Sequence, residues 1–123
     1  MSGDLEQTWR DVVAKHAKVS CALDQALGDE HALSATDFAV LQRLVESDEG
    51  KLRMQELADE IHLSQSALSR LVGRLEDRGL ACRTMCEHDR RGIWTCITDE
   101  GRVLHDEAAP THDRVLSETL SAS

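Results

Sequence analysis

The sequence predicts a mainly α-helical protein with one small β-hairpin. Apolar residues recur at helical spacing through most of the 123 residues. The pattern changes once, in Ile93–Thr98, which is rich in β-branched and aromatic side chains. A chain of this length most often forms one domain, so we expect a single domain over residues 1–123.

The composition excludes several other classes of protein. Hydrophobic residues make up 41% of the chain and charged residues 30%, and the two are interspersed, unlike the pattern of a disordered tail. No apolar run is long enough to span a membrane. Asp4 and Glu6 stand where a secretory signal would be basic, so a cytoplasmic protein with reduced cysteines is expected.

The first expected helix starts at Leu5 and ends near Gly28, because glycine is common at helix C-termini. Its apolar residues are separated by alternating steps of four and three, as in a coiled-coil seam. Such a seam needs a partner helix, from this chain or from a second copy. The seam consists of Leu5, Trp9, Val12, His16, Val19, Leu23 and Ala26.

A second helix is predicted to follow Ser34, because Ser34 and Asp37 resemble a capping box. It ends before the Ser47–Gly50 turn. A third, short helix is expected at Met54–Ile61, followed by a tight turn at His62–Leu63.

Ser64 is placed to cap a fourth helix, which runs from Gln65 to about Arg78. The hairpin strands follow, at Leu80–Glu87 and Gly92–Thr98. A fifth helix begins after Thr98, and Pro110 is expected to kink or divide it.

A short helix, a tight turn, a polar helix and a hairpin with arginines at its tip occur in the order of a winged helix-turn-helix. Gln and Arg side chains bind base edges, Ser binds bases or phosphates, and an arginine gains from the negative potential of a narrow minor groove. Residues 61–102 carry 7 basic and 6 acidic residues, net +1, within a chain of net charge −9. The expected DNA contacts are Ser64, Gln65, Ser66, Ser69, Arg70 and Arg74 on the helix, and Arg90 and Arg91 on the wing, oriented by Asp89. The polar residues of the helix, or the arginines of the wing, would each alone also be typical of a solvated surface. The prediction of DNA binding therefore depends on finding both in this order.

Segment Leu52–Leu80 resembles the helix-turn-helix of MarR-family transcription regulators, and Asp89–Gly92, Ile97–Thr98 and Gly101 resemble that family's wing and next helix. The resemblance implies one MarR-type domain, with dimerisation helices at 5–33 and 100–123 and a DNA-binding region at 34–99. It implies a homodimer that binds double-stranded palindromic DNA as a repressor, without a cofactor. A small phenolic or aromatic acid would release it. The family's terminal helix extends further beyond Thr119, so either this sequence is truncated within that helix or the dimer interface is smaller.

An organic-acid effector would lie near the first, second and fifth helices. The cationic groups able to meet its carboxylate are Lys15, His16, Lys18, His31 and Arg43, and the sequence does not choose among them.

The hairpin cysteines suggest a redox alternative. If the turn is centred on Arg90–Arg91, Cys86 falls opposite Cys96, close to the separation that a disulfide requires, with Cys82 on the same face. Oxidation of this pair would then reposition the wing. The competing interpretation is that these cysteines are small hydrophobic residues under the wing. Together with His88 they supply enough zinc ligands, but no CxxC spacing occurs and no metal is expected.

The sequence supports two other classes of function less well than DNA binding. An enzyme is not expected, because no nucleophile with a positioned base and no glycine-rich phosphate loop is present. A winged helix that binds protein is favoured slightly by the net charge of −9. The two polar, cationic clusters favour DNA instead.

Overall fold

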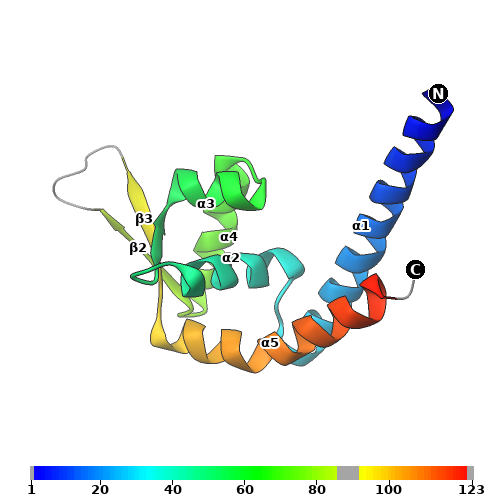
Figure 1. Cartoon of the computed structure of the whole chain (residues 1–123). Coiled ribbons are helices and arrows are strands. Elements are labelled where there is room, and N and C mark those ends of the chain that lie inside the picture. Colours follow the sequence, from blue (N-terminus) through cyan, green and yellow to red (C-terminus); the bar gives the residue numbers. More distant parts are fainter. Residues whose placement is uncertain (1, 86–91, 122–123) are drawn as a thin grey trace. The chain divides into compact units, whose positions relative to one another are not determined.

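The computed structural model describes residues 2–85 and 92–121 (Figure 1). It divides into two compact units, one of Met1–Ala35 with Ala108–Ser123 and the other of Thr36–Glu107. Most described residues are helical and one small antiparallel sheet is present, which confirms the predicted fold class. Within the described residues, no helix combines the length and the apolar character needed to cross a membrane.

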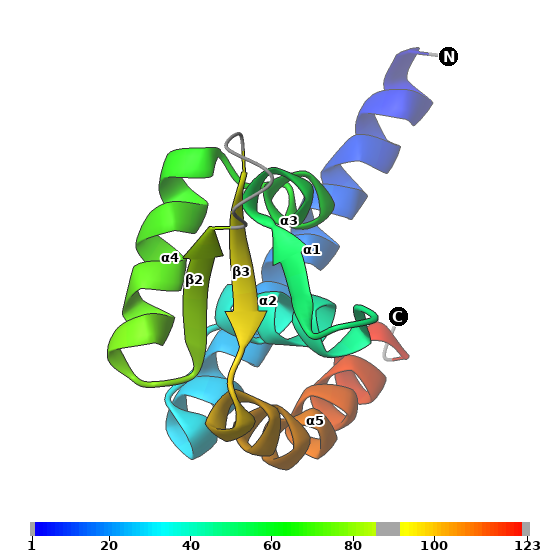
Figure 2. The same cartoon turned by 90° about the vertical axis from the view of Figure 1, so that its left-hand side faces the viewer.

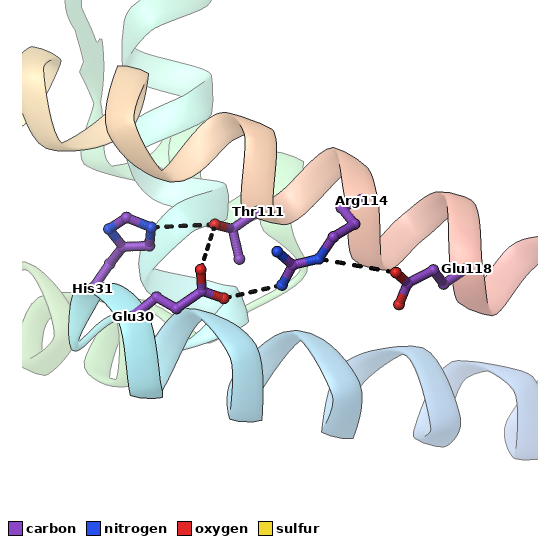
Figure 3. Close-up of polar contacts among 5 residues, drawn as sticks. All are labelled: Glu30, His31, Thr111, Arg114 and Glu118. Atoms are coloured by element: carbon purple, nitrogen blue, oxygen red, sulfur yellow. Dashed lines mark hydrogen bonds and ion pairs between the residues drawn. The ribbon is translucent and has the colours of Figure 1, made fainter.

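The first unit pairs the end of α1 (Ser2–His31) with the C-terminal part of α5 (Asp99–Leu120). Figure 3 shows the polar contacts between them: Arg114 Nη2 lies 3.0 Å from Glu30 Oε2, and Thr111 Oγ1 lies 3.2 Å from His31 Nε2. Apolar burial supports the same packing. The buried apolar residues of this unit are Leu23, Leu27, Leu33, Ala108 and Val115.

The predicted seam of α1 is buried only near its C-terminal end. Leu23 is buried, whereas residues 3–18 are all exposed. Leu5 is 75% exposed and Trp9 63% exposed. The N-terminal half of α1 therefore presents an apolar stripe that the described residues leave exposed.

The predicted end of the first helix near Gly28 is wrong, and so is a division of the fifth helix, one of the two outcomes expected at Pro110. The helix α1 continues through Gly28 to His31, and Ala32, with φ 57°, donates its N–H to the Gly28 carbonyl. An exposed glycine lowers helix stability by only about 1 kcal/mol, which is too little to end a well-packed helix. Likewise α5 is continuous through Pro110, because Ala108 and Thr111, on either side of it, are both buried. The proline removes one backbone donor without dividing the helix.

The second unit contains the remaining elements. In chain order they are α2 (Ala35–Glu46), β1 (Lys51–Arg53), α3 (Met54–Ile61), α4 (Gln65–Asp77), β2 (Ala81–Met85) and β3 (Ile93–Ile97). Figure 2 shows the three antiparallel strands side by side in the order β1-β3-β2, with α4 beside β2. The strand β1 was not expected, because three residues with two charged side chains give no alternation to detect.

The core of this unit lies between the helices and one face of the sheet. Phe38 stacks on the ring of the buried His105, with 5.1 Å between ring centroids. His105 Nε2 also bonds to Gln42 Oε1. The largest fully buried side chains of the unit are Phe38, Val40, Leu41, Leu44, Leu57, Leu68, Val72, Leu75 and Thr95.

Candidate nucleic-acid interface

The start of α4 is fixed by a side-chain cap. Ser64 has extended backbone angles, φ −69° and ψ 157°, and its Oγ accepts a 3.1 Å hydrogen bond from the Ala67 N–H. The predicted N-cap is thus confirmed. The cap satisfies one N–H of the first turn and leaves others facing outward, where they attract a phosphate.

The turn before α4 is short because His62 adopts a left-handed conformation. His62 has φ 60°, and the N–H of Leu63 bonds to the Ala58 carbonyl at 3.0 Å. Histidine is among the residues that tolerate this region better than most others. The predicted His62–Leu63 turn is confirmed, and it fixes the exit of α3 and the entry of α4.

The two faces of α4 differ in polarity. Four apolar side chains are buried toward the core: Leu68, Leu71, Val72 and Leu75. The six predicted DNA contacts lie at the other side of the helix, where Ser69 is partly exposed and the other five (Ser64, Gln65, Ser66, Arg70 and Arg74) are exposed. The structure therefore brings all six together on one outward surface, which we call the recognition surface.

The end of α4 is a glycine stop. Gly79 has φ 74°, its N–H bonds to the Glu76 carbonyl at 2.9 Å, and the N–H of Leu80 bonds to the Leu75 carbonyl at 2.9 Å. This is the hydrogen-bond pattern of a Schellman motif. It turns the chain sharply from α4 into β2, so the wing begins at a defined place beside the recognition surface.

Arg83 ties the wing to α4, a role that sequence reasoning missed. Its Nε lies 3.0 Å from Glu76 Oε1, and its Nη2 donates to the Ser69 carbonyl. A residue on a strand and two on a helix share no spacing that a sequence pattern reveals. The link holds the first wing strand against the helix that carries the recognition surface.

Arg53 and Gln55 extend the candidate interface and were also missed. Both residues line a surface hollow at the start of α3. The other residues that line it are Met54, Gln65, Gly92 and Ile93. The Arg53 guanidinium lies over the Trp94 ring, 5.2 Å from its centroid. In the sequence, the one feature that could have indicated a role for Arg53 and Gln55 in the interface is their position at the start of the third helix.

The comparisons with known proteins agree with this arrangement. The model of the MarR family matches residues 32–92, which include α2, β1, α3, the turn, α4 and β2 and end just before β3. The chain belongs to the MarR family.

Individual relatives support the family assignment. The chain is 32% identical over 92 residues to the HTH-type transcriptional regulator MhqR of Bacillus subtilis, a match covering 75% of this chain and 62% of MhqR. The chain thus spans less than two thirds of the length of this curated relative.

Solved structures match over more of the chain. Sco3205, a MarR family transcriptional regulator from Streptomyces coelicolor in complex with DNA, matches with a TM-score of 0.88 and 29% identity, covering 97% of this chain and 74% of Sco3205. CouR from Rhodococcus jostii bound to p-coumaroyl-CoA matches with a TM-score of 0.78 and 28% identity, covering 87% of this chain and 72% of CouR. These matches confirm the winged-helix fold, and the prediction of a regulator family rather than an enzyme family is confirmed.

Some predicted sites of this MarR-family chain lie outside the described residues. They are Asp89, Arg90 and Arg91 of the wing tip, together with Cys86 and His88. The contacts assigned to the wing arginines stay predictions. Among the residues that are described, no group of three or more potential metal ligands occurs.

The candidate effector groups are spread over both units. Lys15, His16 and Lys18 are exposed on α1, and His31 is partly buried beside Thr111 at the end of α1. Arg43 belongs to the second unit, on α2, where its Nη1 lies 3.6 Å from Glu46 Oε1. The assignment of an effector site to these five residues stays a prediction.

The expected pairing of Cys86 with Cys96 is wrong. Cys96 lies opposite Cys82 in the β2–β3 register. In the observed register Met85 pairs with Ile93, so the hairpin is centred on residue 89. The prediction placed the centre near Arg90–Arg91, and this difference changes the partner of Cys96. Burial, and then the neighbouring Cys96 thiol, raise the pKa of Cys82 above its ordinary value.

Proposed function

We propose that this chain is a sequence-specific DNA-binding transcription regulator whose α4 lies in the major groove. The observation that carries the proposal is the recognition surface, a polar and cationic side of a capped helix whose other side is buried. Gln65, Arg70 and Arg74 suit base edges. Ser64, Ser66 and Ser69, near the free N–H groups of the first turn, suit bases or phosphates.

We infer that the wing reads the flanking minor groove. Arg90 and Arg91 would enter it, with Asp89 holding their side chains in place. Arg53 adds a cation close to Gln65, where the hollow at the start of α3 faces the same side as the first turn of α4. Contacts from two elements position the protein on the duplex more firmly than one helix alone.

We propose that the protein acts as a homodimer. Four apolar side chains of the exposed stripe of α1, Leu5, Trp9, Val12 and Val13, are 46–75% exposed. Contiguous apolar surface of this kind marks an interface, and a second copy of the same helix supplies a matching stripe. In this proposal residues 5–33 and 100–123 are dimerisation helices, residues 34–99 bind DNA, and the operator is palindromic because the dimer has twofold symmetry.

We propose that the regulator is a repressor released by a small aromatic or phenolic acid or its thioester. The ligand in the structure of CouR, p-coumaroyl-CoA, supports this class of effector. The groups that would meet its negative charge come from Lys15, His16, Lys18, His31 and Arg43. Release requires the effector to bind the DNA-free conformation more tightly than the DNA-bound one.

The test is fluorescence anisotropy on DNA from upstream of the protein's own gene, measured over a series of salt concentrations. We expect tight binding to a palindrome that falls steeply with salt, as phosphate contacts require. Arg70→Ala should weaken binding by about 1–3 kcal/mol if Arg70 contacts a base. Lys51→Gln removes one positive charge from β1, outside the recognition surface and outside the proposed dimerisation helices, and should leave the affinity unchanged.

Size-exclusion chromatography separates the two ways in which binding could fail. A monomer without DNA affinity would contradict the proposed dimer interface. A dimer that binds the palindrome no better than random DNA would contradict the proposed regulator and favour a winged helix that binds protein.

A further inference from the structure

The outer face of the three-stranded sheet carries a row of chemically reactive residues. Thr95 is fully buried and its hydroxyl lies 2.6 Å from Met54 Sδ, so it points to the helical side of the sheet. Side chains alternate along a strand, which places Cys96 on the opposite face. There Cys96 has two direct neighbours in register, Cys82 on β2 and Lys51 on β1.

We propose that Cys82 and Cys96 form an oxidation site, at which a hydroperoxide converts the two thiols into a disulfide across β2 and β3. Directly opposite residues have Cβ atoms about 4.5–5.5 Å apart, and a disulfide needs about 3.5–4.5 Å. Closure therefore requires the two strands to approach by about 1 Å. Both cysteines are free and only partly buried, so a small oxidant reaches them.

The surroundings distinguish the two sulfur atoms. The Thr84 hydroxyl lies 3.6 Å from Cys96 Sγ, and Lys51 is the register partner of Cys96 on its other side. The Lys51 ammonium itself lies 3.3 Å from Glu49 Oε2 and over the Trp94 ring, so it is not assigned to the sulfur. Cys82 has a raised pKa, and the Glu76 carboxylate adds to the rise after burial and Cys96. A thiol with a raised pKa forms the attacking thiolate less readily, so in this proposal Cys96 is the attacking sulfur and Cys82 resolves the intermediate.

The reaction balances with the peroxide as the only oxidant. The Cys96 thiolate attacks one peroxide oxygen, the O–O bond breaks, and an alcohol or water leaves after taking up a proton. The product is a sulfenic acid on Cys96. The sulfur of Cys82 then attacks the sulfur of this sulfenic acid, the S–O bond breaks, and water leaves with the Cys82 proton. The two thiols lose two electrons and the peroxide gains them.

The disulfide would change the position of the wing, because Cys82 and Cys96 lie on the two strands that lead into it. Cys82 is adjacent to Arg83, which holds β2 to Glu76 and Ser69 of α4. Drawing β2 toward β3 at residue 82 shifts Arg83 relative to its partners on α4, and with it the wing relative to the recognition surface. This consequence rests on the proposed function. We expect the dissociation constant for operator DNA to rise by about fivefold or more on oxidation.

The experiment uses the full chain carrying Cys21→Ser and Cys86→Ser, which leaves only the proposed pair. After treatment with hydrogen peroxide, thiols are counted under denaturing conditions and the intact mass is measured. We expect both thiols to disappear with a mass loss of two hydrogens, and dithiothreitol to restore them. Thiols that survive peroxide, or a gain of oxygen mass in place of hydrogen loss, would overturn the proposal.

Two further variants test the assigned roles. Cys82→Ser in the same background leaves Cys96 without a partner, so a sulfenic acid that a dimedone probe traps should accumulate. Cys96→Ser should leave Cys82 largely unreactive, and equal labelling of both variants would contradict the assignment. Non-reducing electrophoresis at low protein concentration must show a monomeric band, since a covalent dimer would contradict an intrachain bond.

The thiol count does not involve DNA, so it separates this proposal from the proposed function. If the reduced protein does not bind DNA but peroxide still forms the disulfide, the result contradicts the proposed regulator and not the oxidation site. Reduced protein that binds DNA while its thiols resist peroxide counts against the oxidation site only. If the disulfide forms and DNA affinity is unchanged, the effect of oxidation on the wing is wrong.

Discussion

Arg83 on β2 and Glu76 on α4 form an ion pair, with Arg83 Nε 3.0 Å from Glu76 Oε1. The same guanidinium donates to the Ser69 carbonyl in the middle of the recognition surface. The wing and the recognition helix are thus joined by one side chain. The side chains of Arg83 and Glu76 are 30% and 35% exposed, so the surrounding water weakens their attraction.

Replacing Arg83 should disconnect the wing from α4. We expect Arg83→Met to lower the free energy of unfolding by about 1–2 kcal/mol and to weaken DNA binding, because both the ion pair and the bond to the Ser69 carbonyl are lost. Glu76→Gln removes only the ion pair and should cost at most about 1 kcal/mol. Urea denaturation of both variants checks this, and equal losses would contradict a role for the Ser69 contact.

The cap of α4 gives a second prediction. Ser64→Ala removes the acceptor of the Ala67 N–H and should lower the free energy of unfolding by about 1 kcal/mol. Ser66→Ala is the matched control: Ser66 is also exposed, and its hydroxyl lies 3.3 Å from the Ser64 hydroxyl without capping a backbone N–H in the described part of the chain. Thermal unfolding by circular dichroism compares the two. A Ser66→Ala loss as large as that of Ser64→Ala would show that capping is not the cause.

The helices and turns around α4 were predictable because local signals agree there. The Ser64 cap, the apolar spacing of Leu68, Leu71 and Leu75, and the stop at Gly79 all indicate one helix with one buried side. Each of these signals acts within a few residues. The polar recognition surface follows from them without knowledge of the rest of the fold.

Features that depend on distant residues were not predictable. The partner of Cys96 depends on where the hairpin is centred, and a centre misplaced by about two residues exchanges Cys82 for Cys86. The contact between His105 and Phe38 joins helices far apart in the sequence. The strand β1 is defined by its pairing with β3 rather than by its own three residues.

Two glycines should respond in opposite ways to the same substitution. A Cβ at Gly101 would overlap the Leu80 carbonyl oxygen and lie 2.8 Å from Ile97 Cγ1. The backbone oxygen cannot move aside cheaply, so we expect Gly101→Ala to lower the free energy of unfolding by at least about 2 kcal/mol. A Cβ at Gly28 would meet only the Leu33 carbonyl oxygen at 3.9 Å, so Gly28→Ala should stabilise α1 by about 0.5–1 kcal/mol.

Chemical denaturation of the wild type and the two glycine variants measures both effects. A destabilised Gly28→Ala would show that this part of α1 is not helical in solution. A Gly101→Ala variant as stable as the wild type would contradict the close approach of α5 to the chain between α4 and β2.

The contact between Glu30 and Arg114 makes the first unit sensitive to acid. The hydrogen bond from Arg114, followed by its charge, holds the pKa of Glu30 below its ordinary value of 4.5. A lowered pKa in the folded state means that the contact stabilises the fold above pH 4.5 and that this stabilisation is lost as the pH falls through the folded-state pKa. Because Glu30 lies at the surface, salt should weaken the effect.

We therefore expect Glu30→Gln to have a lower Tm than the wild type at neutral pH, and the difference to vanish at a pH well below 4.5. Glu107→Gln removes an exposed carboxylate from the same helix as Arg114 and should show no such convergence. Thermal unfolding monitored by circular dichroism at a series of pH values, at low and at high salt, makes the comparison. A difference between Glu30→Gln and the wild type that stays constant with pH would show that the Glu30 charge does not stabilise the packing of α1 on α5.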